Sequence, residues 1–91
     1  MSYEKLNKQL IELVGGKDNI KAVAHCVTRL RLTLKDRSLA KTEEIKNLDG
    51  VIDVVSNEVA YQIIVGTHVT DVYNEFMLML GLKPDGEEIE K

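Results

Sequence analysis

The sequence predicts an α+β domain in which a four-stranded, mainly antiparallel sheet carries three helices on one face, in the order α-β-β-α-β-β-α. Segments near both ends of the chain have apolar residues at helical spacing. Between them lie two pairs of short β-type segments separated by turn-forming residues. One of these segments alternates strictly between polar and apolar residues, which is typical of a strand whose second face is left uncovered.

The first predicted helix has a one-sided apolar stripe and ends at Gly15-Gly16, because glycine readily adopts the left-handed conformation that terminates helices. Ser2 is its expected N-cap. The stripe consists of Tyr3, Leu6, Leu10, Leu13 and Val14. A loop at Lys17-Asp18-Asn19 then leads into the first strand.

We expect strands at residues 20–24 and 28–35, joined by a tight turn at or beside Cys26. In the second of these strands the side chains of Arg29, Arg31 and Thr33 share one face, because side chains on a strand repeat with a period of two. The leucines between them would point into the core.

The second half of the chain predicts a short helix capped near Thr42, strands at residues 51–55 and 59–65, and a last helix capped by Thr67 or Thr70. The short helix would bury Ile45 and Leu48. The buried stripe of the last helix consists of Val69, Val72, Tyr73, Phe76 and Leu80.

The composition fits one domain of 91 residues, with 44% hydrophobic and 30% charged residues. A single cysteine excludes an internal disulfide, and the sequence has no metal-ligand spacing, so we expect neither a metal nor a cofactor. The net charge is -3, but residues 17–35 hold five cations and one acid, a local balance of +4. This favours a small anion or an acidic protein as partner. Nucleic acid is disfavoured, because aromatic residues make up only 4%.

Several cysteine chemistries fail on spacing. A cysteine phosphatase needs an arginine six positions after its cysteine, where this chain has Leu32. A thioredoxin-like site needs a second cysteine. Acyl transfer needs a base beside the thiol, but His25 and Cys26 are consecutive, and consecutive strand residues point to opposite faces.

Carrying a phosphoryl group is less demanding. It requires a thiolate at Cys26 and hydrogen-bond donors for the phosphoryl oxygens, which Thr28, Arg29, Arg31 and the N–H groups of the turn could supply. The alternative is a non-catalytic α+β ligand-binding or interaction module with a buried structural cysteine. A third possibility is a regulator of a sugar pathway that uses phosphorylation of this fold as a signal.

The chain resembles the enzyme IIB domain of the phosphoenolpyruvate-dependent sugar phosphotransferase system, in its glucose/sucrose/β-glucoside superfamily. The most specific motif is His25-Cys26-Val27-Thr28-Arg29-Leu30-Arg31, preceded by Gly15-Gly16-Lys17-Asp18-Asn19-Ile20. The resemblance continues in register through Leu34-Lys35-Asp36, Leu48-Asp49-Gly50-Val51, Tyr61-Gln62-Ile63-Ile64-Val65-Gly66 and Asp71-Val72-Tyr73. The turn Asn57-Glu58-Val59-Ala60 departs from the family pattern, which usually contains glycine.

The resemblance implies that Cys26 accepts phosphate from a phosphohistidine of a IIA domain or protein and passes it to a sugar held by the membrane IIC domain. It assigns phosphate binding to Thr28, Arg29 and Arg31. His25 is a possible auxiliary residue, whereas Gln62 and His68 receive no role.

The resemblance also implies an organisation. Residues 1–82 would form the IIB domain, and residues 83–91 a polar tail or the start of an interdomain linker. The chain would then work at the cytoplasmic face of the plasma membrane, as a soluble domain of a sugar permease.

Overall fold

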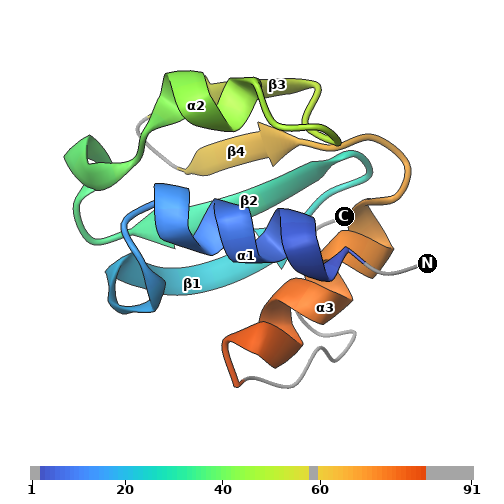
Figure 1. Cartoon of the computed structure of the whole chain (residues 1–91), viewed down its shortest axis with the longest axis horizontal. Helices are drawn as coiled ribbons and strands as arrows, with labels where there is room; N and C mark the ends of the chain where they lie inside the picture. Colours follow the sequence, from blue (N-terminus) through green and yellow to red (C-terminus); the bar gives the residue numbers. More distant parts are fainter. Residues whose placement is uncertain (1–2, 58–59, 82–91) are drawn as a thin grey trace.

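The computed structural model describes residues 3–57 and 60–81. The elements follow the predicted order (Figure 1). They are α1 (Glu4–Leu13), β1 (Ile20–His25), β2 (Arg29–Leu34), α2 (Thr42–Lys46), β3 (Asp53–Ser56), β4 (Tyr61–Ile64) and α3 (Val69–Met79). Two short 3-10 helices that the sequence did not predict, Lys17–Asn19 and Arg37–Leu39, occupy the connections after α1 and after β2.

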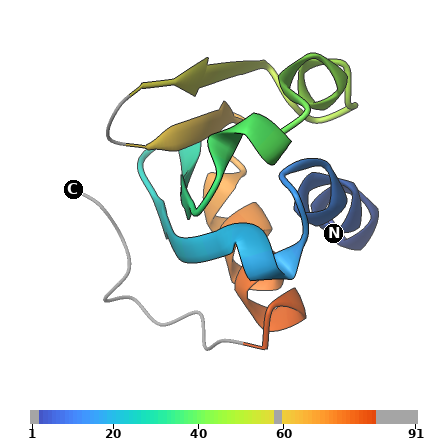
Figure 2. The same cartoon turned by 90° about the vertical axis from the view of Figure 1, so that its left-hand side faces the viewer.

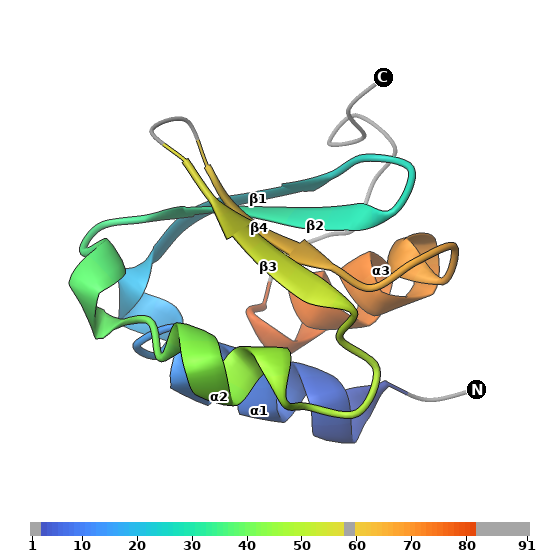
Figure 3. The ribbon, with the colours of Figure 1, turned by 90° about the horizontal axis from the view of Figure 1, so that it is seen from above.

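The four strands form one sheet in the order β1-β2-β4-β3, and every neighbouring pair is antiparallel. Two hairpins, β1–β2 and β3–β4, are thus joined side by side through β2 and β4. All three helices lie on one face of this sheet, as Figure 3 shows from above and Figure 2 from a second direction. The predicted fold class is therefore confirmed.

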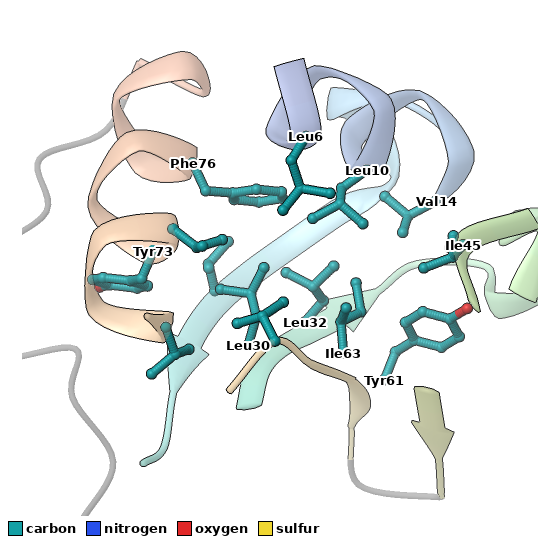
Figure 4. Packing of buried hydrophobic residues seen from close by; sticks show 14 of the residues in the cluster. Leu6, Leu10, Val14, Leu30, Leu32, Ile45, Tyr61, Ile63, Tyr73 and Phe76 are labelled. Carbon is teal, nitrogen blue, oxygen red and sulfur yellow. The ribbon is translucent and has the colours of Figure 1, made fainter. Parts of the chain in front are cut away.

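The core lies between the sheet and the helices. Leu30 and Leu32 of β2 are fully buried, and they pack in one cluster with Leu10 of α1, Ile63 of β4 and Phe76 of α3 (Figure 4). The whole predicted stripe of α3 is buried as well. Burial alternates strictly along β2, because the leucines face the helices and the residues between them lie on the face that no helix covers.

The predicted helix caps differ from those of the structure. Lys41 precedes α2 as its N-cap, and His68 precedes α3, each without a side-chain cap. The hydroxyl of Thr42 instead lies 2.8 Å from the hydroxyl of Tyr61, so this threonine ties α2 to the sheet. Burial raises the pKa of Tyr61, and the hydrogen bond to Thr42 acts in the opposite sense. The predicted cap Ser2 lies outside the described residues.

A polar joint connects the end of α1 to the end of β2. Gly15 ends the helix with a φ of +106°, and a Cβ at that position would lie 2.7 Å from Nδ2 of Asn19. Nδ2 of the buried Asn19 donates to the carbonyls of Val14 (2.7 Å) and Asp36 (2.9 Å), while its Oδ1 accepts from the Asp36 N–H at 2.9 Å. The Gly15–Asn19 motif thus has a structural role here.

The two ends of the sheet carry different turns. Ser56 pairs with Tyr61 at the end that carries the β3–β4 turn, whereas Asp53 pairs with Ile64 at the other end. Because Ile64 also pairs with Arg29, that second end is the one with the β1–β2 turn. The unusual part of the β3–β4 turn, Glu58 and Val59, lies outside the described residues.

Among the residues described, no helix has both the length and the apolar character needed to cross a membrane.

Candidate functional site

The β1–β2 turn holds most of the residues singled out in the sequence. His25 ends β1 and Arg29 begins β2, so Cys26, Val27 and Thr28 form the connection. The Cys26 N–H donates to the carbonyl of Arg29 at 2.8 Å and closes the turn. Thr28 therefore lies in the turn rather than in the strand where it was predicted. Figure 3 shows this turn at one end of the sheet, beside the segment that leads into α3.

A second set of hydrogen bonds fixes the turn to the rest of the sheet. The carbonyl of Thr28 accepts from the N–H groups of Val65 (3.0 Å) and Gly66 (3.1 Å), which directly follow β4. The backbone of the turn is thus fixed by a hydrogen bond within the β1–β2 hairpin and by two hydrogen bonds from the residues after β4. The side chain of Thr28 is half-buried.

His25 supports the turn from the helix side of the sheet. Its ring is buried and lies against the ring of Tyr73 of α3, with the centroids 4.5 Å apart. Its Nδ1 is 3.0 Å from the carbonyl oxygen of Cys26. Because a carbonyl can only accept, this nitrogen carries the hydrogen in that bond. Nε2 is also buried and has no hydrogen-bond partner among the described residues.

The alternation along β1 places the side chain of Cys26 on the face of the sheet that no helix covers, opposite to His25. Ala24 pairs with Arg31 and is half-buried, whereas His25 pairs with Leu30 and is buried on the helix side of the sheet. One residue further, Cys26 lies across from Arg29 and follows Ala24 in the alternation. Cys26 is a free thiol of intermediate exposure.

The surface around the turn is partly apolar. Val27 at its tip is 81% exposed. Ile52, just before β3, is 68% exposed and lies next to Gly66, since a Cβ on that glycine would be 3.3 Å from Cδ1 of Ile52.

Both arginines lie where the alternation predicted, half-buried on the uncovered face of β2. The structure adds a residue to which the sequence analysis gave no role. Gln62 of β4 pairs with Arg31 in register, and its Oε1 accepts from Nη1 of Arg29 at 3.1 Å. Only 6% of Gln62 is exposed. An amide within an otherwise apolar strand was the available signal. His68 instead lies near the ring of Tyr3, with centroids 6.2 Å apart.

The site thus combines one thiol with a basic, hydrogen-bonding strand face. Of the five sequence-predicted residues, His25 ends β1, Cys26 and Thr28 lie in the turn, and Arg29 and Arg31 lie in the first half of β2, so the structure brings them to one end of the sheet. Among the described residues no group of three or more histidine, cysteine, aspartate or glutamate side chains could hold a metal ion. A thiol and two guanidinium groups at one end of the sheet are groups that can take up and hold an anion.

Comparisons with known proteins identify the family. Residues 8–40, which include the turn, match the family described as phosphotransferase system, EIIB. A solved structure, one domain of the phosphotransferase system IIabc component from Clostridium difficile, has a TM-score of 0.78 and 36% identity, with 89% of this chain and 84% of that chain covered. The chain belongs to the EIIB family.

Two curated relatives of this EIIB domain are sugar-specific components. It is 44% identical over 87 residues to the β-glucoside-specific EIIBCA component of Halalkalibacterium halodurans, with 96% of this chain covered. It is 48% identical over 77 residues to the sucrose-specific EIIBC component of Bacillus subtilis, with 84% of this chain covered. The chain spans only 14% and 17%, respectively, of the lengths of these relatives.

Proposed function

We propose that this EIIB domain carries a phosphoryl group on Cys26 between a phosphohistidine of a IIA domain and a sugar bound by a membrane IIC domain. The observation that carries the proposal is the position of the thiol, in a turn of the EIIB-matching segment and across the strand pair from Arg29. Relatives named EIIBCA and EIIBC components support the choice of partners.

The proposed reaction has two displacements at phosphorus. First, the Cys26 thiolate forms an Sγ–P bond while the N–P bond of the phosphohistidine breaks and its imidazole becomes neutral. Then a sugar hydroxyl forms the new O–P bond, the Sγ–P bond breaks, and the hydroxyl proton leaves to a base or water on the acceptor side. Thr28, Arg29 and Arg31 bind the phosphoryl oxygens in both steps.

The open face of the sheet suits a carrier that meets two partners in turn. All three helices lie on the other face, so donor and acceptor can approach the same turn. A structural cysteine, the alternative function class, is disfavoured because Cys26 is not among the buried residues. Fast reaction of the native thiol with an alkylating reagent supports the carrier, whereas protection until unfolding supports the structural role.

Mass spectrometry of the intact chain tests the proposal. We expect the gain of one phosphoryl group after incubation with phosphoenolpyruvate, the general phosphotransferase proteins and a IIA protein from a β-glucoside or sucrose system. Cys26→Ser should gain none, while His68→Gln should gain one as the wild type does. A phosphoryl group that persists in Cys26→Ser contradicts the assignment.

The proposal extends to the organisation of the longer protein. Residues 1–82 would form the IIB domain, and residues 83–91, which lie outside the described part, would form a tail or linker. Fused to or associated with IIC, the domain would then work at the cytoplasmic face of the plasma membrane. Cross-linking of Val27→Cys to IIC in membranes would test this placement.

A further inference from the structure

We infer that Gln62 is a positioning residue, which holds the Arg29 guanidinium in place for the phosphoryl group on Cys26. This inference rests on the proposed function. It begins with the hydrogen bond between Nη1 of Arg29 and Oε1 of Gln62, 3.1 Å long, which links the strands β2 and β4 above the uncovered face.

The burial of Gln62 indicates what surrounds it. Its neighbours Tyr61 and Ile63 point toward the helices, so Gln62 points to the face that no helix covers. It is nevertheless 94% buried, and the residues next to it on that face are its register partners Arg31 and Val55 together with Arg29. The amide of Gln62 is thus buried among its neighbours on this face, and one of these neighbours is Arg29, the residue that it would hold in place.

The chemistry of an amide suits this task. A guanidinium has only donors, so the oxygen of Gln62 must face Arg29. The bond uses one of several N–H donors and leaves the others for phosphoryl oxygens. Because the amide is neutral, the positive charge of Arg29 remains available. A carboxylate at position 62 would hold the guanidinium more strongly, but it would also compete with the phosphoryl group.

Holding the guanidinium in advance removes an ordering cost from the transfer step. A long arginine side chain loses rotamer freedom when it is fixed. Two cations at neighbouring positions of one strand face also repel each other, which would push a free Arg29 away from Arg31. The bond to Gln62 opposes both effects.

The first test is independent of phosphate transfer. In nitrogen-15 NMR of the whole chain, the Arg29 guanidinium should show slow rotation in the wild type and fast averaging in Gln62→Leu. Thr33→Val changes an exposed residue on the same face of β2 and should leave the Arg29 signals unchanged. Equal Arg29 mobility in the wild type and Gln62→Leu overturns the inference, whether or not Cys26 is ever phosphorylated.

The second test measures delivery. Phosphorylated wild-type and variant domains are mixed with IIC-containing membranes and sugar, after circular dichroism has shown that each variant is folded. Gln62→Leu and Gln62→Glu should both deliver about tenfold more slowly, the first through lost positioning and the second through competition. Acceptance from IIA by Gln62→Leu should stay within about twofold of wild type, because the donor protein supplies part of the charge stabilisation.

A double-mutant cycle separates positioning from a general structural effect. In an Arg29→Ala background, Gln62→Leu should change delivery by less than about twofold, since there is no guanidinium left to hold. An equal loss in both backgrounds would mean that Gln62 only stabilises the sheet and would overturn the inference. A wild-type chain that accepts no phosphate contradicts the proposed function, and the NMR result then still decides the role of Gln62.

Discussion

The alternation of burial along β2 puts Arg29 and Arg31 on the face opposite the buried leucines, and their guanidinium groups are planar forks that a lysine cannot replace. In the proposed transfer to a neutral sugar hydroxyl the acceptor brings no cation, so this domain would have to stabilise the charge on the phosphoryl oxygens. We expect Arg29→Lys and Arg31→Lys to be phosphorylated on Cys26 but to deliver phosphate on the order of a hundredfold more slowly. Sugar phosphorylation by IIC-containing membranes measures this.

Arg37 offers a matched control for these two variants. It donates to the side chain of Ser56 and to the carbonyl of Asn57 at the opposite end of the sheet. Arg37→Lys makes the same chemical change away from the turn and should deliver at the wild-type rate. If Arg29→Lys and Arg31→Lys also deliver at that rate, the two arginines belong to an ordinary solvated strand face.

His25 gives a second prediction, because it bonds the Cys26 carbonyl and lies against Tyr73. In His25→Phe the ring contact is kept and the hydrogen bond is lost. We expect a folded protein whose acceptance of phosphate from IIA is slower by about tenfold, since the thiol is less well placed.

His68→Phe is the control for this change, since His68 also lies near an aromatic ring but in a different place. Time-resolved mass spectrometry of the phosphorylated chain provides the rates. Equal acceptance by His25→Phe and the wild type would show that the hydrogen bond from Nδ1 does not position Cys26.

Single residues also show where sequence reasoning ends. The alternation from Arg29 onward predicts correctly which side chains are buried, because it depends only on the local period of a strand. The bond from Arg29 to Gln62 depends on β2 lying next to β4, and no local pattern contains that information. The contact of His25 with Tyr73 similarly requires the docking of α3.

At the scale of elements, Asn19 joins α1, β1 and β2 through bonds to Val14 and Asp36. Asn19→Ala removes three side-chain hydrogen bonds, of which the one to the Val14 carbonyl is buried and the two to Asp36 are part-buried. We expect the free energy of unfolding to fall by about 2–4 kcal/mol, measured by urea denaturation.

Asn47→Ala is the matched substitution, because Asn47 is exposed at the end of α2. It should change the free energy of unfolding by less than about 0.5 kcal/mol. A comparably small effect for Asn19→Ala would mean that water replaces the lost bonds and that the joint does not stabilise the fold.

The boundaries of elements were predicted less well than their order. The run of β-branched residues from Val51 suggested a strand at once, but β3 begins only at Asp53. The intrinsic preference of threonine predicts a cap at Thr42, but its hydroxyl instead hydrogen-bonds with that of Tyr61. Both differences arise because tertiary neighbours outweigh local preference.

At the scale of the whole molecule, charge is separated along the chain. Residues 17–35 have a balance of +4 within a chain of net charge -3, and they include both β1 and β2. A cationic hairpin speeds the approach of an acidic partner or a phosphorylated one. We expect Lys21→Glu to lower the second-order rate of phosphate acceptance by about threefold at low salt, with the difference disappearing at high salt.

Lys8→Glu changes the net charge equally but lies on α1, on the helix face. Both lysines are exposed, so neither substitution should disturb the core. Lys8→Glu should therefore affect acceptance less than Lys21→Glu at every salt concentration. Equal effects of the two would mean that only the net charge of the domain matters.

The strand order β1-β2-β4-β3 also determines how the polypeptide can reach its native state. Each hairpin joins neighbours in sequence and can close on the microsecond scale. The seam between β2 and β4, by contrast, pairs Leu30 with Ile63 across the intervening α2 and β3, so its formation carries a larger loop-closure entropy. Folding is therefore expected to be limited by the meeting of two preformed hairpins, and the strand face on which Arg29 contacts Gln62 does not exist until they meet.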